Sequence, residues 1–581
     1  MTSNRANRFS RTVISLGLAL LLFVLPACNN TPAESSDPDS STPGSDTSAT
    51  TSTTEASGTT SGTESTAPSG STGTQGTTSG STGSTVKPTT SKTTKKTTTA
   101  TTQKEEDVMC TDYDYRNDKF YKKDKYYISW INTWYGSTES WFNVQDRHSK
   151  YTAKLKVNGE YVTPDNNLQP VREEIFKQAK EAKIDALFMD LTNGYSGWTK
   201  ASKAYQKMCY ENGMKFGVAT HPRIENGVSN IETICEYTWK SYAGPGEAIH
   251  SSAYFYKEGK PLMVLYCTWQ EFQAALRATG KYTSRFAFTW ASGEDSKTDK
   301  WGWQLEAQDG PQLSSDSMFV TCSISWNSPN GSKDSWRKSL AFFDFCFLAA
   351  KEANPKYTIV GMIDDTHERN GWMKMDTTNV VYTVPKLGDK TVPEICRSLQ
   401  MRDIYGNISE DAFYNRVKSW INGTVKPYHT GGLIADGAYT LTNVASNKKF
   451  GTDRPASGAN RIPSTDVGGT FQPGNVLTPM ESYYWFYHLG NNEYRVIKLS
   501  SGLALQNGDN DKLVQLYMDT SAEQRWILKK NADGTFQILN KKTGKAITDA
   551  GKSADIVLTA ANSGDQNQLW KIEPVAGRTF G

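Results

Sequence analysis

Four residues able to take part in acid/base chemistry follow one apolar stretch of the chain. Residues 357–363 read Tyr-Thr-Ile-Val-Gly-Met-Ile and are followed by Asp364, Asp365, His367 and Glu368. In a parallel barrel, active sites form at the carboxyl ends of the strands. Two carboxyl groups suit hydrolysis of a sugar acetal, because one protonates the leaving oxygen while the other handles the charge at the anomeric carbon. We therefore predict Asp365 and Glu368 as a catalytic pair, with Asp364 and His367 as substrate contacts.

Structural roles are open for the same residues. Asp364 also fits an exposed turn, and His367 also fits a side chain that orients a neighbouring carboxylate. The oxygens of Asp364, Asp365 and Glu368 could instead bind a calcium ion, but the loop lacks further regularly spaced ligands. The chain has no Cys-x-x-Cys pair, and no glycine-rich phosphate loop follows a predicted strand. We therefore predict neither a metal site nor a cofactor.

Other predicted strands also end in polar or aromatic residues. Tryptophan and tyrosine rings stack on the C–H faces of sugars while amides and carboxylates bond hydroxyl groups, so these strand ends favour a carbohydrate ligand. Asp190 and His221 also fit structural hydrogen bonding, and Trp303 also fits a cover over the barrel mouth together with Trp301. The predicted substrate contacts at these strand ends are Trp134, Tyr135, Asp190, His221, Trp290, Glu294 and Trp303.

Apolar runs of strand length recur along residues 105–430, and segments with helical spacing separate many of them. The predicted strands are 126–131, 186–190, 216–220, 262–267, 286–290, 318–324, 358–363 and 380–384. The predicted helices are 171–182, 202–210, 269–279, 336–353 and 392–404. A strand followed by a helix, repeated about eight times, matches a (β/α)8 TIM barrel in count and length. A doubly wound sheet is the alternative.

Three motifs in this region resemble the bacterial glycoside hydrolase family 71/99-like barrels. They are Trp134-Tyr135-Gly136, Gly310-Pro311-Gln312 and the segment from Met362 to Glu368. The resemblance covers residues 126–425 and implies a retaining hydrolase of α-linked glycans, in which Asp365 assists the substrate's own 2-hydroxyl and Glu368 is the general acid/base. The chain departs from the family in having aspartate at 365, where glutamate is usual, and Arg369-Asn370, where glycine is common. Because carboxylate separation distinguishes retention from inversion, this departure leaves substrate and stereochemistry open.

The last part of the chain repeats a pattern that ends in tryptophan. Trp485, Trp526 and Trp570 are spaced as in the three lobes of a β-trefoil. Two of them are preceded by Gln524 and Gln568, a Gln-x-Trp signature that resembles ricin-B-type lectins and family 13 carbohydrate-binding modules. The resemblance implies an all-β trefoil carbohydrate-binding domain at residues 431–576. Its predicted sugar site lies in the second lobe, at Gln506, Asn510 and Tyr517. Glutamine replaces the usual aspartate at 506, so a trefoil that serves packing alone is the alternative.

The N-terminal part of the chain has the pattern of an export signal followed by a tether. Three arginines precede an apolar run that ends in Leu25-Pro26-Ala27-Cys28, which predicts a signal peptide at residues 1–28. Its end resembles a bacterial lipobox, which implies lipidation of Cys28; an ordinary secretory signal is the alternative. Residues 29–104 are almost wholly Ser, Thr, Gly, Pro and Ala, which predicts a disordered linker. We therefore expect an extracellular protein that is lipid-anchored to the bacterial cell membrane.

The formal net charge of +3 gives no sign of nucleic-acid binding. The expected partners are a polysaccharide or glycoprotein glycan and, through the lipid anchor, the membrane. The sequence predicts a (β/α)8 catalytic domain at 105–430 joined to a trefoil that keeps it near its substrate, so the expected function is an extracellular glycoside hydrolase. One alternative is a non-catalytic carbohydrate-binding surface lipoprotein. Another is a glycan-modifying esterase, although no Gly-x-Ser-x-Gly elbow is present.

Overall fold

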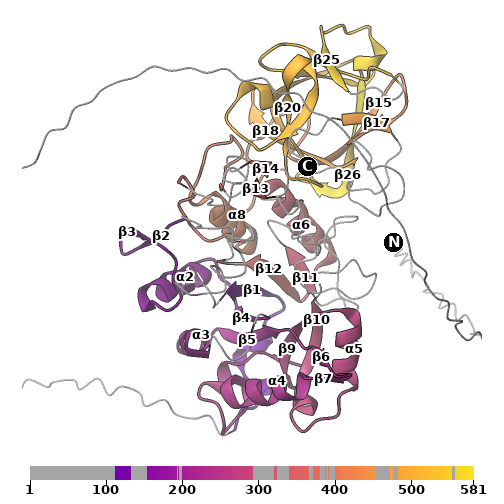
Figure 1. The fold of residues 1–581 in the computed structure, drawn as a ribbon. Coiled ribbons are helices and arrows are strands. Elements are labelled where there is room, and N and C mark those ends of the chain that lie inside the picture. Colours follow the sequence, from indigo (N-terminus) through magenta and orange to yellow (C-terminus); the bar gives the residue numbers. More distant parts are fainter. Residues whose placement is uncertain are drawn as a thin grey trace, which may run out of the picture. The chain divides into compact units, whose positions relative to one another are not determined.

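The computed structural model of the chain is shown in Figure 1. It divides into Met1–Thr98 and a compact unit, Thr99–Gly581. The predicted signal peptide with Cys28, and the predicted linker, lie outside the described residues. In the described part of the chain, no helix is long and apolar enough to cross a membrane. The structure describes residues 112–132, 153–192, 194, 199–291, 319–322, 339–364, 371–379, 386–387, 390–391, 400–452, 471–474, 482–551 and 556–581.

A sheet of seven parallel strands forms the centre of the α/β region. The strands are rich in β-branched and aromatic residues and are buried over most of their length, as expected of a sheet covered on both faces. In spatial order they are β10 (Ala287–Ala291), β9 (Lys260–Tyr266), β5 (Lys215–Thr220), β4 (Ala186–Leu191), β1 (Tyr126–Asn132), β12 (Tyr357–Met362) and β11 (Phe319–Cys322). A short strand, β8 (Tyr256–Lys257), pairs antiparallel with β9.

The sheet bends around its own apolar interior. Tyr126, Ile128 and Trp130 alternate along β1 and belong to one buried cluster that also contains residues of β4, β5, β9, β10 and β12. Ala291 of β10 and Ile359 of β12 share this cluster although four strands lie between them in the sheet. The inner surface is therefore concave, which gives the α/β region the character of a half-barrel.

Helices cover the outer face of this sheet (Figure 1). Ile131 of β1, for example, belongs to a second cluster together with residues of the helices. The helices are α2 (Gln169–Glu181), α3 (Thr199–Glu211), α4 (Ile231–Thr238), α5 (Trp269–Arg277), α6 (Leu340–Ala353) and α8 (Ala412–Ile421). Three hairpins complete the region: β2 (Leu155–Val157) with β3 (Glu160–Val162), β6 (Ile224–Glu225) with β7 (Val228–Ser229), and β13 (Lys386–Leu387) with β14 (Lys390–Thr391).

The last predicted elements of this region are described only in part. The predicted strand at 380–384 lies outside the described residues. The predicted helix at 392–404 was wrong at its end, because residues 400–404 are described and are not helical. The amide of Met401 is bonded to the hydroxyl of Thr377, and Arg402 pairs with Ile408. Thr377 and Ile408 lie outside the apolar pattern that suggested a helix, so this pattern could not indicate their contacts with Met401 and Arg402.

The C-terminal region is a β-trefoil-like domain of short antiparallel strands. Trp485, Trp526 and Trp570 are fully buried, and the indole N–H groups of Trp526 and Trp570 donate to the carbonyl oxygens of Leu505 and Ile547, in equivalent places of two lobes. The strands are β15 (Gly437–Asn443), β16 (Lys449–Thr452), β17 (Phe471–Gly474), β18 (Tyr484–Gly490), β19 (Glu493–Lys498), β20 (Ala504–Asn507), β21 (Leu513–Leu516), β22 (Arg525–Lys530), β23 (Phe536–Asn540), β24 (Ala546–Thr548), β25 (Val557–Thr559) and β26 (Trp570–Thr579).

A buried carboxylate links the two regions. Asp344 of α6 accepts hydrogen bonds from Arg416 Nε and Nη2 (2.6 and 2.9 Å) and from the Trp420 indole N–H (2.8 Å). It also accepts one from the hydroxyl of Tyr487 on β18 (3.2 Å), across the predicted domain boundary at residue 430. One apolar cluster continues from α6 to Trp485 and Tyr487. These contacts explain why residues 99–581 form a single compact unit.

Candidate functional site

The carboxyl ends of β1 and β12 are joined by Asp364. Its Oδ1 accepts the backbone N–H of Asn132 (2.8 Å), and the side-chain amide of Asn166 lies 3.4 Å from its Oδ2. The carboxylate is 2% exposed, so it does not occupy the exposed turn that was one reading of the sequence. Asp364 therefore fixes the point at which the chain leaves β12 and enters the loop predicted to carry catalysis.

Asn166 extends this arrangement into a buried polar network. Its side-chain N–H donates to the carbonyl oxygen of Asn132 (2.6 Å), and its Oδ1 accepts the hydroxyl proton of Tyr205 on α3 (2.6 Å). Burial raises the pKa of Tyr205 well above its ordinary value, so this hydroxyl stays protonated and remains a donor. Sequence reasoning missed both residues, because Asn166 and Tyr205 lie in segments without an active-site pattern.

Asn132 itself has an unusual environment at the end of β1. Strand periodicity places its side chain on the same concave face as Trp130, and in the sheet it is the register partner of Asp190. The residue is completely buried, and within the described part of the chain neither Oδ1 nor Nδ2 has a hydrogen-bond partner. Burying an unpaired polar group costs about 1–3 kcal/mol. This amide is therefore the strongest sign of a ligand position at the carboxyl edge.

Asp190 lies beside it, as the sequence predicted for a residue at a strand end. One of its carboxylate oxygens, Oδ1, accepts the backbone N–H and the hydroxyl proton of Thr192 (2.9 and 2.6 Å). These hydrogen bonds fix the position of the Asp190 carboxylate. Its contact with a substrate stays a prediction. Asn132, Asp190 and Asp364 thus come together from three adjacent strand ends.

A cavity with a volume of about 360 Å³ opens next to these strands, after β4 and β5. The imidazole of His221 lines it, and His221 Nε2 lies 3.4 Å from Glu271 Oε2. The residues lining the cavity are Leu191, Thr192, Gly194, Thr220, His221, Arg223, Glu225, Asn230 and Thr233. The structure therefore places His221 at a polar cavity on the carboxyl side of the sheet, where a substrate contact was predicted.

Glu271 is held by a capping box at the start of α5. The hydroxyl of Thr268 accepts the Glu271 backbone N–H, and Glu271 Oε2 accepts the Thr268 backbone N–H and lies near its hydroxyl. A Thr-x-x-Glu pattern before an apolar helix predicts this arrangement. That signal could have located Glu271 in the sequence, but not its contact with His221 from another loop.

Trp290 was predicted as a substrate contact, and the structure places it elsewhere. Its ring is 2% exposed and packs against Trp269 and Phe272, with centroids 4.9 and 6.0 Å away. Its indole N–H donates to the carbonyl oxygen of Cys267 (2.8 Å). The structure therefore does not bring Trp290 to the cavity that contains His221, because this residue faces the helices rather than the concave side.

The remaining predicted residues of this region lie outside the described part of the chain. They are Trp134, Tyr135, Glu294, Trp303, Asp365, His367 and Glu368. Their roles stay predictions. Among the described residues, no group of three or more His, Cys, Asp or Glu side chains is arranged to hold a metal ion.

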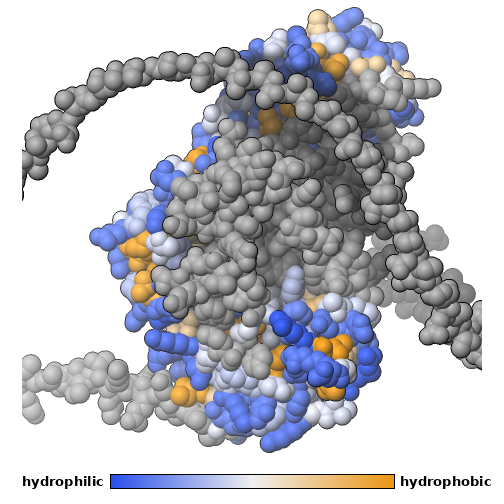
Figure 2. Space-filling view, viewed as in Figure 1, coloured by the Kyte–Doolittle hydropathy of each residue, from blue (hydrophilic) through white to orange (hydrophobic). Residues whose placement is uncertain are grey.

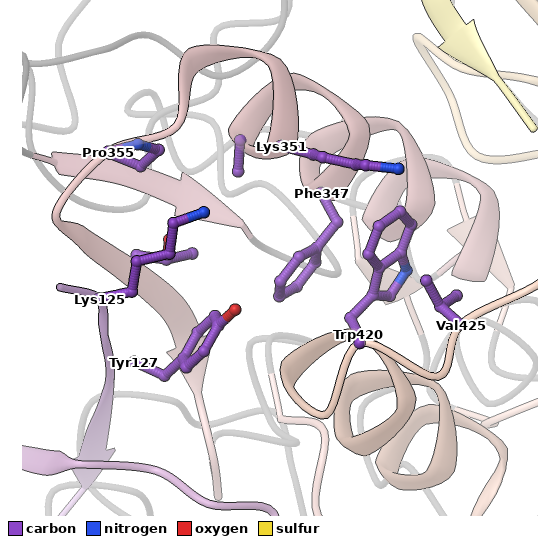
Figure 3. A pocket seen from close by; sticks show the side chains of 10 residues that line it. Lys125, Tyr127, Phe347, Lys351, Pro355, Trp420 and Val425 are labelled. Atoms are coloured by element: carbon purple, nitrogen blue, oxygen red, sulfur yellow. The ribbon is translucent and has the colours of Figure 1, made fainter. Parts of the chain in front are cut away.

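A second cavity, of about 260 Å³, lies at the opposite end of the sheet (Figure 3). Tyr127 and Thr358 line it from the amino-terminal halves of β1 and β12, while Phe347 and Trp420 line it from α6 and α8. Phe347 and Trp420 are stacked on one another, with ring centroids 5.1 Å apart. Because the amino-terminal end of a parallel barrel serves stability, we do not assign this cavity to the candidate site.

The three residues of the predicted sugar site in the trefoil have different surroundings. Gln506 Oε1 accepts a hydrogen bond from Gln524 Nε2 (2.9 Å), which also donates to the carbonyl oxygen of Tyr517 (2.8 Å). Asn510 lies in the exposed turn between β20 and β21 with a left-handed backbone (φ 56°). Tyr517 is only 9% exposed, so most of its ring belongs to the core. The Gln-x-Trp glutamine therefore organises this lobe, as its structural role predicts.

Comparison with known proteins finds one family model that matches part of the C-terminal region. The model of the ricin-type beta-trefoil lectin domain-like family matches residues 481–555 and 522–581. The second half of the C-terminal region is thus similar to ricin-type lectin-like domains, as its Gln-x-Trp repeats indicated. A search of curated proteins gives no match.

Several solved structures are similar to this chain over about a quarter of its length. The designed threefold-symmetric protein ThreeFoil is 20% identical, with 24% of this chain and 99% of that chain covered and a TM-score of 0.21. A Polyporus squamosus lectin is 17% identical, with 25% and 50% covered and a TM-score of 0.20. The exo-beta-1,3-galactanase 1,3Gal43A from Clostridium thermocellum is 18% identical, with 29% and 33% covered and a TM-score of 0.22. The chain thus spans half of that lectin and a third of that galactanase.

Proposed function

We propose that this protein is a cell-surface glycoside hydrolase whose α/β region cleaves α-linked glycosidic bonds while its lectin-like trefoil holds it on glycan. The observation that carries the proposal is the buried, unpartnered amide of Asn132 beside Asp190 and Asp364. An amide donor and acceptor next to carboxylates is the arrangement that binds sugar hydroxyl groups. A ligand that fills these bonds removes the cost of leaving them unmade.

A complete (β/α)8 barrel is the proposed form of the α/β region. The seven parallel strands run in spatial order from β10 to β11, and one further strand between these two would close the sheet. The concave interior and the outer helices support the same architecture, in which chemistry belongs at the carboxyl edge.

Asp365 and Glu368 carry the chemistry in this proposal. The buried hydrogen bond from the Asn132 backbone N–H to Asp364, the residue before Asp365, supports a position for them near the end of β1. Glu368 donates its proton to the glycosidic oxygen and later removes one from the attacking water, while Asp365 accepts the proton of the substrate's 2-hydroxyl as that oxygen attacks the anomeric carbon. In the second displacement the water oxygen attacks the anomeric carbon, the bond from that carbon to the 2-oxygen breaks, and Asp365 returns the proton to the 2-oxygen. Two displacements at the same carbon retain the anomeric configuration.

The proposed location is the outer surface of the bacterial membrane. The lipobox-like sequence at Cys28 supports a lipid anchor, and the following residues to 104 have the composition of an extended tether. Two glycan-binding parts on one chain raise the local concentration of substrate at the catalytic edge.

Saccharide release tests this proposal. The protein and its Glu368→Gln variant are incubated with α-mannans, α-glucans and mucin O-glycans, and products are read by mass spectrometry. Release by the parent alone is the expected result. No release from any glycan, with glycan binding retained, would instead support a non-catalytic capture protein, the second candidate, which the lectin-like family match favours.

A further inference from the structure

Trp269 is exposed at the carboxyl side of the sheet. It is the first residue of α5, which starts directly after the loop that follows β9. The side chain is 37% exposed, and it is the one tryptophan among the large exposed hydrophobic side chains of the described residues. Figure 2 shows hydrophobic residues gathered over α5 and the β6–β7 hairpin and surrounded by hydrophilic ones. Leaving an indole ring of this size exposed to water costs free energy, and a ligand that covers the ring removes part of that cost.

The exposed ring is held in one orientation by the residues behind it. Its centroid lies 4.9 Å from that of Trp290 and 5.7 Å from that of Phe272. Trp290 is anchored in turn through its indole N–H, and the capping box at Thr268 fixes the first turn of the helix. A ring that is already ordered loses little conformational entropy when a ligand stacks on it.

Hydrogen-bonding groups lie on segments that neighbour α5. Glu271, two residues after Trp269 on α5, lies 3.4 Å from the imidazole of His221, and His221 lines the 360 Å³ cavity. The β6–β7 hairpin packs next to α5, and Arg223, Glu225 and Asn230 around that hairpin line the same cavity. An apolar plane next to polar side chains matches a pyranose, which has C–H groups on its faces and hydroxyl groups around its edge.

The position of Trp269 separates it from the proposed catalytic loop. β9 is four strands from β12, or about 19 Å measured along the curved sheet at the usual spacing between strands. A sugar stacked on Trp269 is therefore a different unit from the sugar whose bond is cleaved. Such an outer contact helps only a substrate that is long enough to reach both places.

We propose that the first turn of α5 forms part of an outer sugar subsite, in which Trp269 stacks on a pyranose ring and His221 bonds hydroxyl groups of the same saccharide chain. This rests on the proposed function and narrows it: the substrate is an oligosaccharide or polysaccharide chain of several units rather than a monosaccharide conjugate.

The test compares short and long substrates. Hydrolysis of α-mannooligosaccharides and α-glucooligosaccharides of two and of six units is measured for the protein and for Trp269→Ala, Trp269→Phe and Leu276→Ala. Leu276 is the matched control, because it is 50% exposed on the same helix, seven residues after Trp269. All variants are first checked for an unchanged melting temperature.

The expected result is a loss of kcat/KM for the six-unit substrate of roughly fivefold to tenfold in Trp269→Ala, as stacking energies suggest. The two-unit substrate is affected less than twofold, Trp269→Phe keeps most of the activity, and Leu276→Ala equals the parent. An unchanged rate in Trp269→Ala on long substrates would overturn the subsite while leaving the hydrolase intact. Equal losses in Trp269→Ala and Leu276→Ala would also overturn it, in favour of an apolar face for a protein partner.

A parent without hydrolytic activity contradicts the proposed function, and calorimetric binding of the six-unit saccharides then decides on the subsite. Weaker binding in Trp269→Ala alone would support a subsite in a capture protein. Equal binding, or none in the parent, would overturn it.

Discussion

Replacing Asp344 by alanine should strongly destabilise the compact unit formed by residues 99–581. The change removes the acceptor for two N–H groups of Arg416, for the Trp420 indole and for the Tyr487 hydroxyl. Arg416 is 6% exposed and becomes a buried cation without its counter-ion.

The magnitude follows from these contacts. Removing one partner of a buried ion pair costs about 3–5 kcal/mol. Arg416 still donates to the carbonyl oxygen of Lys426 (2.9 Å), and its guanidinium stays 4.4 Å from the centre of the Tyr428 ring. These remaining contacts place the expected loss near the lower limit, about 3 kcal/mol. Because Asp344 joins the α/β region to the trefoil, both regions should lose stability together.

Equilibrium unfolding in guanidinium chloride, followed by tryptophan fluorescence and near-ultraviolet circular dichroism, measures this loss. Asp114→Ala is the control, since its ion pair with Arg116 is largely exposed and should contribute little to stability. Asp344→Leu combined with Arg416→Met should recover most of the stability, because no charge is left unpaired. A loss below about 1 kcal/mol in Asp344→Ala, or a double variant as unstable as the single one, would refute the reasoning.

Two further predictions concern other buried polar groups. Asn132→Ala should leave the melting temperature unchanged or raise it, because the change removes an unpaired buried amide. The same variant should lower kcat/KM on a cleaved glycan at least tenfold. A lower melting temperature with full activity would contradict the ligand role of Asn132. Burial raises the pKa of Asp436 to about 6, so the folded chain holds a proton that the unfolded chain releases at lower pH. Its contribution to stability is therefore present below about pH 4 and is lost as the pH rises through 6. Unfolding free energies of Asp436→Asn should accordingly change less than those of the parent between pH 4 and 7, and identical pH profiles would refute this.

Local sequence patterns were sufficient to locate most of the parallel strands. Strands such as β4 and β5 are short apolar runs buried on both faces, and the spacing of Trp485, Trp526 and Trp570 indicated the trefoil. The sequence also located α6, although this helix has no polar face over most of its length. Its residues from Leu340 to Ala350 are all buried, because both the sheet and the trefoil contact it.

The candidate site was less accessible from sequence. Asp190, His221 and Asp364 stand out because they end strands, but Asn166 and Tyr205 meet only after α2 and α3 fold against the sheet. The outward direction of Trp290 depends on strand register, which a short apolar run does not specify. Trp269 was assigned to a helix and not to a site, because its exposure is a tertiary property.

The most direct test of the central claim is the release of saccharides from α-mannans, α-glucans and mucin O-glycans by the parent, Glu368→Gln and the control Glu211→Gln. Glu211 ends α3, shortly before β5 begins, and is exposed. The account predicts equal release by the parent and Glu211→Gln and a loss of at least a hundredfold in Glu368→Gln, as for removal of a general acid/base. Full release by Glu368→Gln, or none by the parent on any of these glycans, would contradict it.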